Sequence, residues 1–243
     1  MHLNSGFYKD LDTNFKCACD MLEKDFSHAE LLDMLKNGNI PQKQISAMKI
    51  GMVNEDEADA LIANLTGCDG KIREAVALKI NQLLNSDEKY IGIFSKYYLT
   101  FAQASIDING NICKLVIDSA AILKNDKNFC EKYLLKILDY TKEAFKGLDD
   151  IVFRDKKYTV NKQLFKLYWC LESIKLFAAD MESDVLLPIL ERASEEREYT
   201  IREKAAQILL NISDIKYLSL INKLKNDENY YVRAVFNKPC NIS

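Results

Sequence analysis

Apolar residues recur at every third or fourth position along most of this chain. The spacing is typical of amphipathic helices, and it is clearest in six stretches: 28–38, 55–67, 88–104, 130–147, 183–196 and 214–227. A second amphipathic stretch follows each of them, starting near 42, 72, 112, 160, 201 and 232. Only eight glycines and three prolines interrupt the pattern, too few for the many tight turns of an all-β protein. We therefore expect an all-α chain built from helical pairs.

The second helices of these pairs resemble one another in sequence. "IREKAAQILLNI" from Ile201 and "IREAVALKINQL" from Ile72 share Ile-Arg-Glu and then a pair of small residues, and "YVRAVF" repeats the opening near the C-terminus. Weaker copies start at 42, 112 and 160, which places successive starts 30, 40, 48, 41 and 31 residues apart. Two-helix units of this length stack into solenoids. The pattern predicts one domain over 1–243, with a capping segment at 1–27 and about five to six helical pairs over 28–243.

The stretch "DVLLPILERASEEREYTIREKAAQILLNI" at 184–212 resembles a HEAT repeat, an armadillo-like helical unit. It has a proline in its first helix, then a turn, a hydrophobe-Arg pair and paired alanines. The resemblance implies a right-handed superhelical solenoid whose second helices line a concave surface. It also implies a ladder between neighbouring repeats, in which Arg73 pairs with Asp69 and Arg202 with Glu198.

Several residues are of types that commonly cap or bend helices. Ser183, Asp184 and Asp214 are predicted N-caps. Four glycines that follow apolar stretches are predicted left-handed C-caps: Gly38, Gly67, Gly110 and Gly147. Pro188 is expected to bend the helix that contains it.

Groups that carry catalysis are sparse. The two histidines, His2 and His28, are too few for a Cys-His nucleophile or a mixed-ligand zinc site. Cys17 and Cys19 lie two residues apart, which on a helix directs them to different sides, so we expect them to be small buried fillers. No Gly-rich phosphate loop, GxSxG elbow or HExxH motif is present. We expect no catalytic residue, no metal site and no cofactor.

Charge and targeting signals point to an ordinary cytoplasmic protein. The net charge is −3, which does not favour nucleic acid as a partner. Seven scattered cysteines are typical of reduced thiols. The first residues lack the features of a signal peptide, and charges interrupt every apolar run before membrane-spanning length. We expect no membrane partner.

Two places break the repeat pattern and are candidate partner-binding sites. The first is the basic stretch 154–166, in the longest gap between helices, where Arg154, Lys156, Lys157 and Lys162 are the candidates. It is either a solvated loop or a contact for an acidic partner, a phosphate or nucleic acid. The second is Tyr168 and Trp169, on a helix that is apolar on two sides. Such a helix is either buried core or an aromatic anchor for a partner.

These patterns favour a non-enzymatic scaffold or adaptor that binds a protein or peptide on the concave surface. Two alternatives stay open. One is a nucleic-acid-binding or glycosylase-like HEAT protein, because such glycosylases carry a tryptophan near an acidic residue, here Trp169 and Glu172. The other is a lyase-like helper that holds a small cofactor in a pocket near Trp169.

Overall fold

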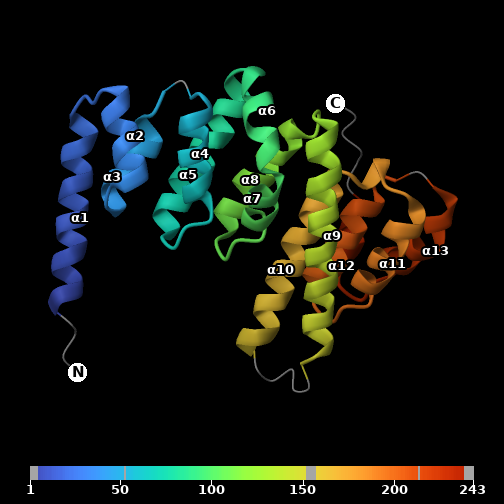
Figure 1. The fold of residues 1–243 in the computed structure, drawn as a ribbon. Helices are drawn as coiled ribbons and strands as arrows, with labels where there is room; N and C mark the ends of the chain where they lie inside the picture. Colours follow the sequence, from blue (N-terminus) through green and yellow to red (C-terminus); the bar gives the residue numbers. More distant parts are fainter. Residues whose placement is uncertain (1–4, 52, 152–156, 213, 238–243) are drawn as a thin grey trace. The chain divides into compact units, whose positions relative to one another are not determined.

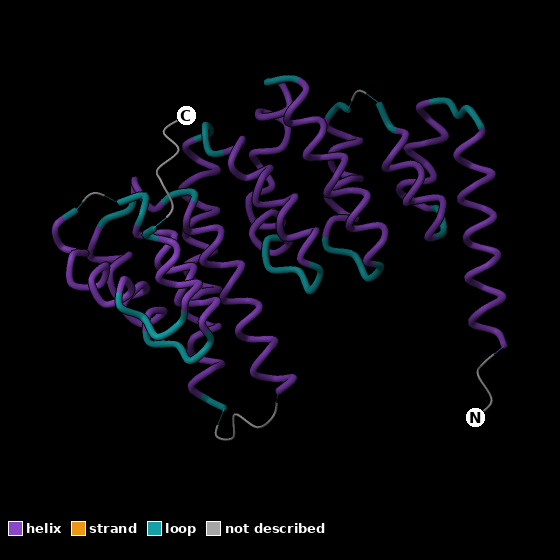
Figure 2. The backbone as a smooth tube through the Cα atoms, turned by 180° about the vertical axis from the view of Figure 1, so that it is seen from behind, coloured by secondary structure: helices purple, strands orange, loops and turns teal. Residues whose placement is uncertain are grey.

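The computed structural model describes residues 5–51, 53–151, 157–212 and 214–237, with side chains from residue 13 in the first helix and from residue 160 in the helix that starts at 157. Every regular element in these ranges is helical, as Figures 1 and 2 show, so the all-α prediction is confirmed. Within them, no helix is both long enough and apolar enough to cross a membrane.

The helices fall into two compact units, residues 1–131 and 132–243. The prediction of one continuous domain stays a prediction. The first unit contains α1 (Ser5–Glu23), α2 (His28–Asn37), α3 (Ile40–Lys49), α4 (Glu55–Leu65), α5 (Gly70–Ser86), α6 (Lys89–Phe94), α7 (Tyr98–Ala104) and α8 (Gly110–Leu123). After α9 (Lys127–Asp149), which crosses the boundary, the second unit contains α10 (Lys157–Lys175), α11 (Ser183–Ser194), α12 (Tyr199–Leu209), α13 (Leu218–Lys225) and α14 (Tyr230–Val235).

Each unit has two layers of helices. In the first unit α1, α3, α5 and α8 pack side by side in that order, and α2, α4 and the α6–α7 segment cover one side of this row. In the second unit α10, α12 and α14 form the equivalent row, and α11 packs beside α13. We call these rows the second-helix layers. The predicted capping segment contains α1, which packs against α3, and its capping role stays a prediction.

The small residues of the repeat are buried between helices. Ala205 and Ala206 of α12 are fully inaccessible to solvent, and Val76 and Ala77 of α5 nearly so. The helix α12 is in contact with α10, α11, α13 and α14, so Ala205 and Ala206 lie in a packed interior. The predicted burial of the small residues is confirmed, and their role in a close approach of helices stays a prediction.

Asparagine, serine and aspartate side chains cap many of the helices. Ser27, Asn39 and Asn54 each form a capping box with the residue three positions later, and Asp69 accepts from the backbone N–H groups of Lys71 and Ile72. Asp214 caps a short 3₁₀ helix, Ile215–Tyr217. Ser183 and Asp184 were wrongly predicted as N-caps, because α11 begins at Ser183 itself.

No described glycine has a positive φ, so the predicted left-handed conformation is wrong, although Gly38 does occupy the C-cap position of α2. Gly110 begins a helix rather than ending one, and Gly147 lies inside α9. A Cβ on Gly147 would lie 2.6 Å from the amide end of the Gln163 side chain of α10, a flexible group that can move aside. Pro188 lies within α11 as predicted.

The stretch 88–104, predicted as one helix, is divided in the structure. A 3₁₀ turn at Ser95–Tyr97 separates α6 from α7. Ser95 is buried there, and its hydroxyl hydrogen-bonds the Asp126 carboxylate beyond α8. The helix is thus interrupted where Ser95 makes a tertiary contact. The spacing of apolar residues is continuous through this point, so the sequence pattern did not predict the interruption.

Candidate binding groove

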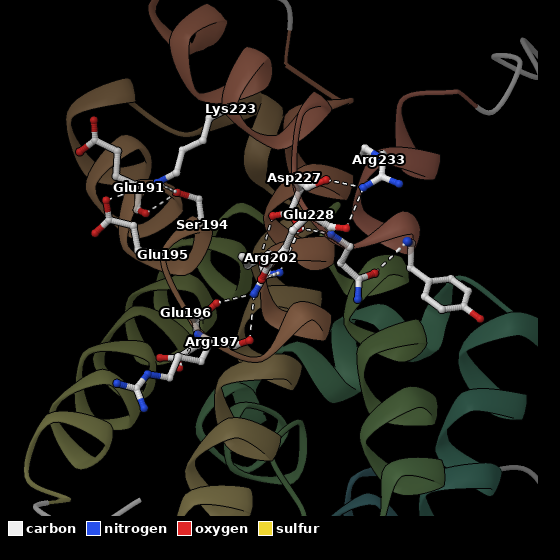
Figure 3. A network of polar contacts seen from close by, with 12 residues as sticks. Glu191, Ser194, Glu195, Glu196, Arg197, Arg202, Lys223, Asp227, Glu228 and Arg233 are labelled. Atoms are coloured by element: carbon white, nitrogen blue, oxygen red, sulfur yellow. Dashed lines mark hydrogen bonds and ion pairs between the residues drawn. The ribbon is translucent and has the colours of Figure 1, made fainter.

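A buried arginine links successive helical pairs in each unit. Figure 3 shows Arg202 at the start of α12, where its Nε and Nη2 donate to both oxygens of Asp227, at 2.8 and 3.0 Å. Its Nη1 donates to the main-chain carbonyls of Glu196 and Arg197, in the turn before α12. The side chains of Arg202 and Asp227 are only 8% and 9% exposed. Arg202 therefore ties its own turn to the turn of the following pair.

Arg73 repeats this arrangement in the first unit. It donates to both oxygens of Asp107, at 2.7 and 3.1 Å, and to the carbonyls of Gly67 and Cys68. The ladder predicted from the resemblance thus exists, but its acidic partners were wrong. Asp69 caps its own helix, and Glu198 makes no capping bond. The true partners lie one pair further along the chain, each two residues before an asparagine N-cap.

Acid is expected to weaken the Arg202–Asp227 pair. Burial raises the pKa of Asp227, but hydrogen bonds from Arg202 and from the Asn229 N–H lower it by more, so the net pKa is below its ordinary value. Because folding depresses this pKa, the unfolded chain takes up the proton first as pH falls. The contribution to stability is therefore complete above the ordinary carboxyl pKa of about 4 and is lost below it. Urea unfolding at pH 7, 5, 4 and 3 measures the loss.

Other carboxylates, such as Glu57 and Glu172, also have lowered pKa values and therefore also contribute to the loss of stability in acid. Comparison of the wild type with Asp227→Asn isolates the contribution of Asp227. We expect the variant to be less stable than wild type at pH 7, with the difference shrinking toward pH 3. A difference that stays constant over this range would contradict the assigned role of Asp227.

The candidate groove lies in the second-helix layer of the second unit. It has a volume of about 440 Å³ and is lined by residues of α10 and of the start of α12: Asn161, Leu164, Phe165, Tyr168, Trp169, Glu198 and Thr200. The α10 residues are spaced by three or four, so they form one stripe along the helix. Phe165 is 39% exposed, and Tyr168 and Trp169 are partly buried.

The aromatic side chains hold one another in place. The Phe165 and Trp169 rings meet edge to face with centroids 6.1 Å apart, and those of Tyr168 and Trp169 at 5.2 Å. Such pairs contribute about 0.5–1.5 kcal/mol beyond the area that they bury. The Trp169 indole N–H is buried and has no hydrogen-bond partner among the described residues. Trp169 is thus fixed by ring packing, with one donor unused.

A partly buried ion network contacts the Tyr168 ring of the groove. The Lys204 ammonium of α12 lies 4.6 Å from the centre of the Tyr168 ring and pairs with Glu172, which also accepts from Lys175 at 2.5 Å. Burial raises the pKa of Glu172, but the bonds from Lys175 and Lys204 bring the net pKa below its ordinary value. Burial lowers the pKa of Lys204, and Glu172 more than reverses this. Both groups are therefore charged at neutral pH.

The structure places only some of the predicted candidates. Tyr168 and Trp169 line the groove, and Lys162 is exposed on the same helix. Arg154 and Lys156 lie outside the described residues, as does the side chain of Lys157. Lys166 pairs with Glu143 at 2.8 Å and lies over the Tyr140 ring.

Sequence reasoning did not single out Phe165, Leu164 or Glu198 as candidates. Phe165 lies four residues before Trp169, and this spacing predicts that the two side chains share one face of the helix. Glu198 joins the groove through contact between α10 and α12, which no local pattern reports.

Other reactive groups of the described chain have structural partners. His28 contacts the buried Glu57 carboxylate at 2.7 Å, where Glu57 also completes a capping box. In the described ranges, no three His, Cys, Asp or Glu residues are grouped so as to hold a metal ion. Cys17 and Cys19 are only partly buried, so the expectation of core fillers was wrong for both.

Comparison with known proteins supports the architecture alone. No family model and no curated protein matches this chain. It is similar in structure to an engineered protein solved by crystallography, with a TM-score of 0.51, 12% identity, and coverage of 88% of this chain and 96% of that one. The chain has an all-α fold of stacked helical pairs, a solenoid architecture. A computationally designed armadillo repeat protein for modular peptide recognition also matches this solenoid, with a TM-score of 0.47, 12% identity, and coverage of 87% and 99%.

Proposed function

We propose that this solenoid is a non-enzymatic scaffold that binds a protein or peptide partner in the groove between α10 and α12. The observation that carries the proposal is the groove itself, which combines three packed aromatic side chains with the polar groups of Asn161, Glu198 and Thr200. Aromatic anchors surrounded by a few polar groups are typical of peptide-binding sites.

The residues that line the groove indicate which side chains a partner peptide carries. Leu164, Phe165 and Trp169 accept a large apolar side chain. Lys162 and the basic residues that precede α10 in the sequence favour an acidic flank. The partner segment is therefore an extended peptide with an apolar anchor next to Asp or Glu.

Other roles find less support in the contacts of this site. In the glycosylase-like hypothesis, Glu172 is the acidic residue that acts with Trp169. In the structure Glu172 forms ion pairs with Lys175 and Lys204, and its pKa is lowered. A general acid or base at neutral pH needs a pKa moved toward 7 rather than away from it. These contacts favour a structural role for Glu172.

Panning of a random 12-residue peptide library tests the proposal. The wild-type protein is the bait, and Phe165→Asp is the counter-selection. We expect enriched peptides to carry an aromatic or large aliphatic residue beside Asp or Glu. Phe165→Asp is expected to weaken their binding by about tenfold or more, since a buried Phe contributes about 1.5–3 kcal/mol. Fluorescence anisotropy of labelled peptides measures the affinity.

Two further variants sharpen this test. Leu135→Asp places the same charge on another exposed apolar residue of the second unit, in α9, and is expected to leave binding unchanged. Lys162→Glu is expected to weaken binding most at low salt. Peptides that bind Phe165→Asp as tightly as wild type would show that the groove is not the site.

A further inference from the structure

Arg233 of α14 occupies the same position in its helix as the ladder arginines Arg73 and Arg202. All three lie four residues after the N-cap residue of a second helix. In each, Nη1 donates to the main-chain carbonyls five and six residues earlier, which fixes the guanidinium against its own turn. Arg233 is therefore oriented toward its turn in the same way as the two arginines that bind an aspartate.

The other side of the Arg233 guanidinium differs from its two counterparts. Nε and Nη2 of Arg202 donate to both oxygens of Asp227. Arg73 binds Asp107 in the same way. Among the residues that the structure describes, Arg233 makes hydrogen bonds through Nη1 alone (Figure 3). Because Nε and Nη2 of arginine form a fork that matches the geometry of a carboxylate, the fork of Arg233 is held in place and available to one.

The surroundings of Arg233 are less covered than those of Arg202. Arg202 is buried, Ala205 one turn later is fully inaccessible to solvent, and α14 packs against their helix. The corresponding residues of the last described pair, Arg233 and Phe236, are only partly buried. Since residues three apart share one face of a helix, an apolar ring lies beside the fork. A further stacked helical pair would cover both groups.

The two complete ladder contacts specify where the acid of such a pair lies. Asp107 and Asp227 each belong to the turn between the two helices of the following pair. Each lies two residues before the asparagine that caps the second helix, and accepts a hydrogen bond from the main-chain N–H of that asparagine. This bond holds the carboxylate in a defined place. A partner of Arg233 is therefore expected to carry an aspartate at the same position of its turn.

Neither the residues that follow α14 nor a second copy of the chain offers a matching acid. Residues 236–243 contain no Asp or Glu. A second copy stacked head to tail would present the turn before α3, where Asn37 stands two residues before the N-cap Asn39. In addition, α3 is already in contact with α1. These features favour a helical pair of another protein.

We propose that the α13–α14 end of the second unit is a stacking surface for a helical pair of a partner protein, which places an aspartate of its turn in the guanidinium fork of Arg233. The contact continues the arginine ladder and buries Phe236. This surface is separate from the α10–α12 groove, so Phe165→Asp is expected to leave stacking unchanged. The two proposals therefore stand or fall independently.

Arginine side-chain NMR tests the free protein without any substitution. The Nε–H groups of Arg73 and Arg202 donate to carboxylates at 2.7 and 2.8 Å and are expected to exchange slowly with water. The Nε–H of Arg233 is expected to exchange at least about tenfold faster. Exchange as slow as that of Arg202 would overturn the proposal, because Arg233 would then already have an acceptor in the free protein.

Panning of a displayed library of two-helix hairpins tests the partner. The turn and one face of the hairpin are randomised, the wild-type protein is the bait, and Arg233→Ala is the counter-selection. We expect enriched hairpins to carry Asp two residues before the N-cap of the second helix. Arg233→Ala is expected to weaken their binding at least about tenfold, and Arg233→Lys to weaken it as well, because lysine keeps the charge but lacks the fork.

A double-mutant cycle assigns this loss to the proposed contact. Replacing the Asp of the hairpin by Asn is expected to weaken binding to wild type and to have no further effect on binding to Arg233→Ala. Arg197→Ala removes an exposed arginine from the turn before α12 and is expected to leave binding unchanged.

Three results would contradict a stacking partner of this kind. One is a selection that enriches no hairpin with an acidic turn, and another is equal binding by wild type and Arg233→Ala. The third is a wild-type dimer in analytical ultracentrifugation that Arg233→Ala converts to monomer, because a second copy of the chain would then occupy the surface.

Discussion

Arg202→Ala is expected to lower the free energy of unfolding by about 3–5 kcal/mol, the range found when one partner of a buried ion pair is removed. The substitution leaves the Asp227 carboxylate buried without its cation, and it leaves the carbonyls of Glu196 and Arg197 without their shared donor. Urea unfolding followed by circular dichroism measures the loss.

Arg197→Ala is the matched control for this prediction. Arg197 lies in the same turn, but its side chain is exposed, so its removal is expected to change stability by no more than about 0.5 kcal/mol. If the two variants were equally stable, Arg202 would not be the tie between the α11–α12 and α13–α14 pairs. Arg73→Ala is expected to repeat the large loss in the first unit, since Arg73 binds Asp107 in the same way.

Ala206→Leu is expected to cost about 1–3 kcal/mol, because extra methyl and methylene groups in a packed core force neighbouring helices apart. Ala206 is fully buried on α12, which contacts α10, α11, α13 and α14. Helix propensity does not account for such a loss, since alanine and leucine are both strong helix formers. Thermal and urea unfolding measure it.

Ala63→Leu makes the same chemical change on an exposed position of α4. We expect its effect to stay within about 0.5 kcal/mol. Equal stability of the two leucine variants would mean that the space around Ala206 accommodates a larger residue, and that the small pair is not required for helix approach.

The helical pairs could be predicted because the information that specifies them is local. An apolar stripe at a spacing of three to four residues identifies a helix without knowledge of what covers it. The starts predicted near 72, 112 and 201 lie within two residues of the observed starts of α5, α8 and α12. The buried positions of Val76, Ala77, Ala205 and Ala206 followed from the same pattern.

Predictions that depended on a partner elsewhere in the chain were less successful. The resemblance to a HEAT repeat implied that Arg202 ties neighbouring repeats, but it matched Arg202 with Glu198, the acidic residue in the turn before its own helix. The real partner, Asp227, is set by which turn packs against which. Gly147 has the sequence context of a helix end, but it lies inside α9, which continues to Asp149.

The candidate groove likewise combines features that local spacing predicts with features that depend on a neighbouring helix. The sequence identified α10 as unusual, since Leu164, Leu167 and Leu171 trace one apolar stripe and Phe165 and Trp169 another. The structure distinguishes the residues of these stripes: Leu167 and Leu171 are inaccessible to solvent, whereas Leu164, Phe165 and Trp169 line the groove. An amphipathic pattern identifies the apolar faces of a helix, but it does not indicate which of these faces a neighbouring helix covers.

The sequence by itself determined the all-α class, the order of most helices and the buried positions of the small residues, because each depends on spacing within one helix. The tertiary structure alone decided the acidic partners of Arg73 and Arg202, the break between α6 and α7, and the candidate groove. These features arise where side chains far apart in the sequence meet. Their energies depend on burial and geometry that the spacing of residues along one chain segment does not contain.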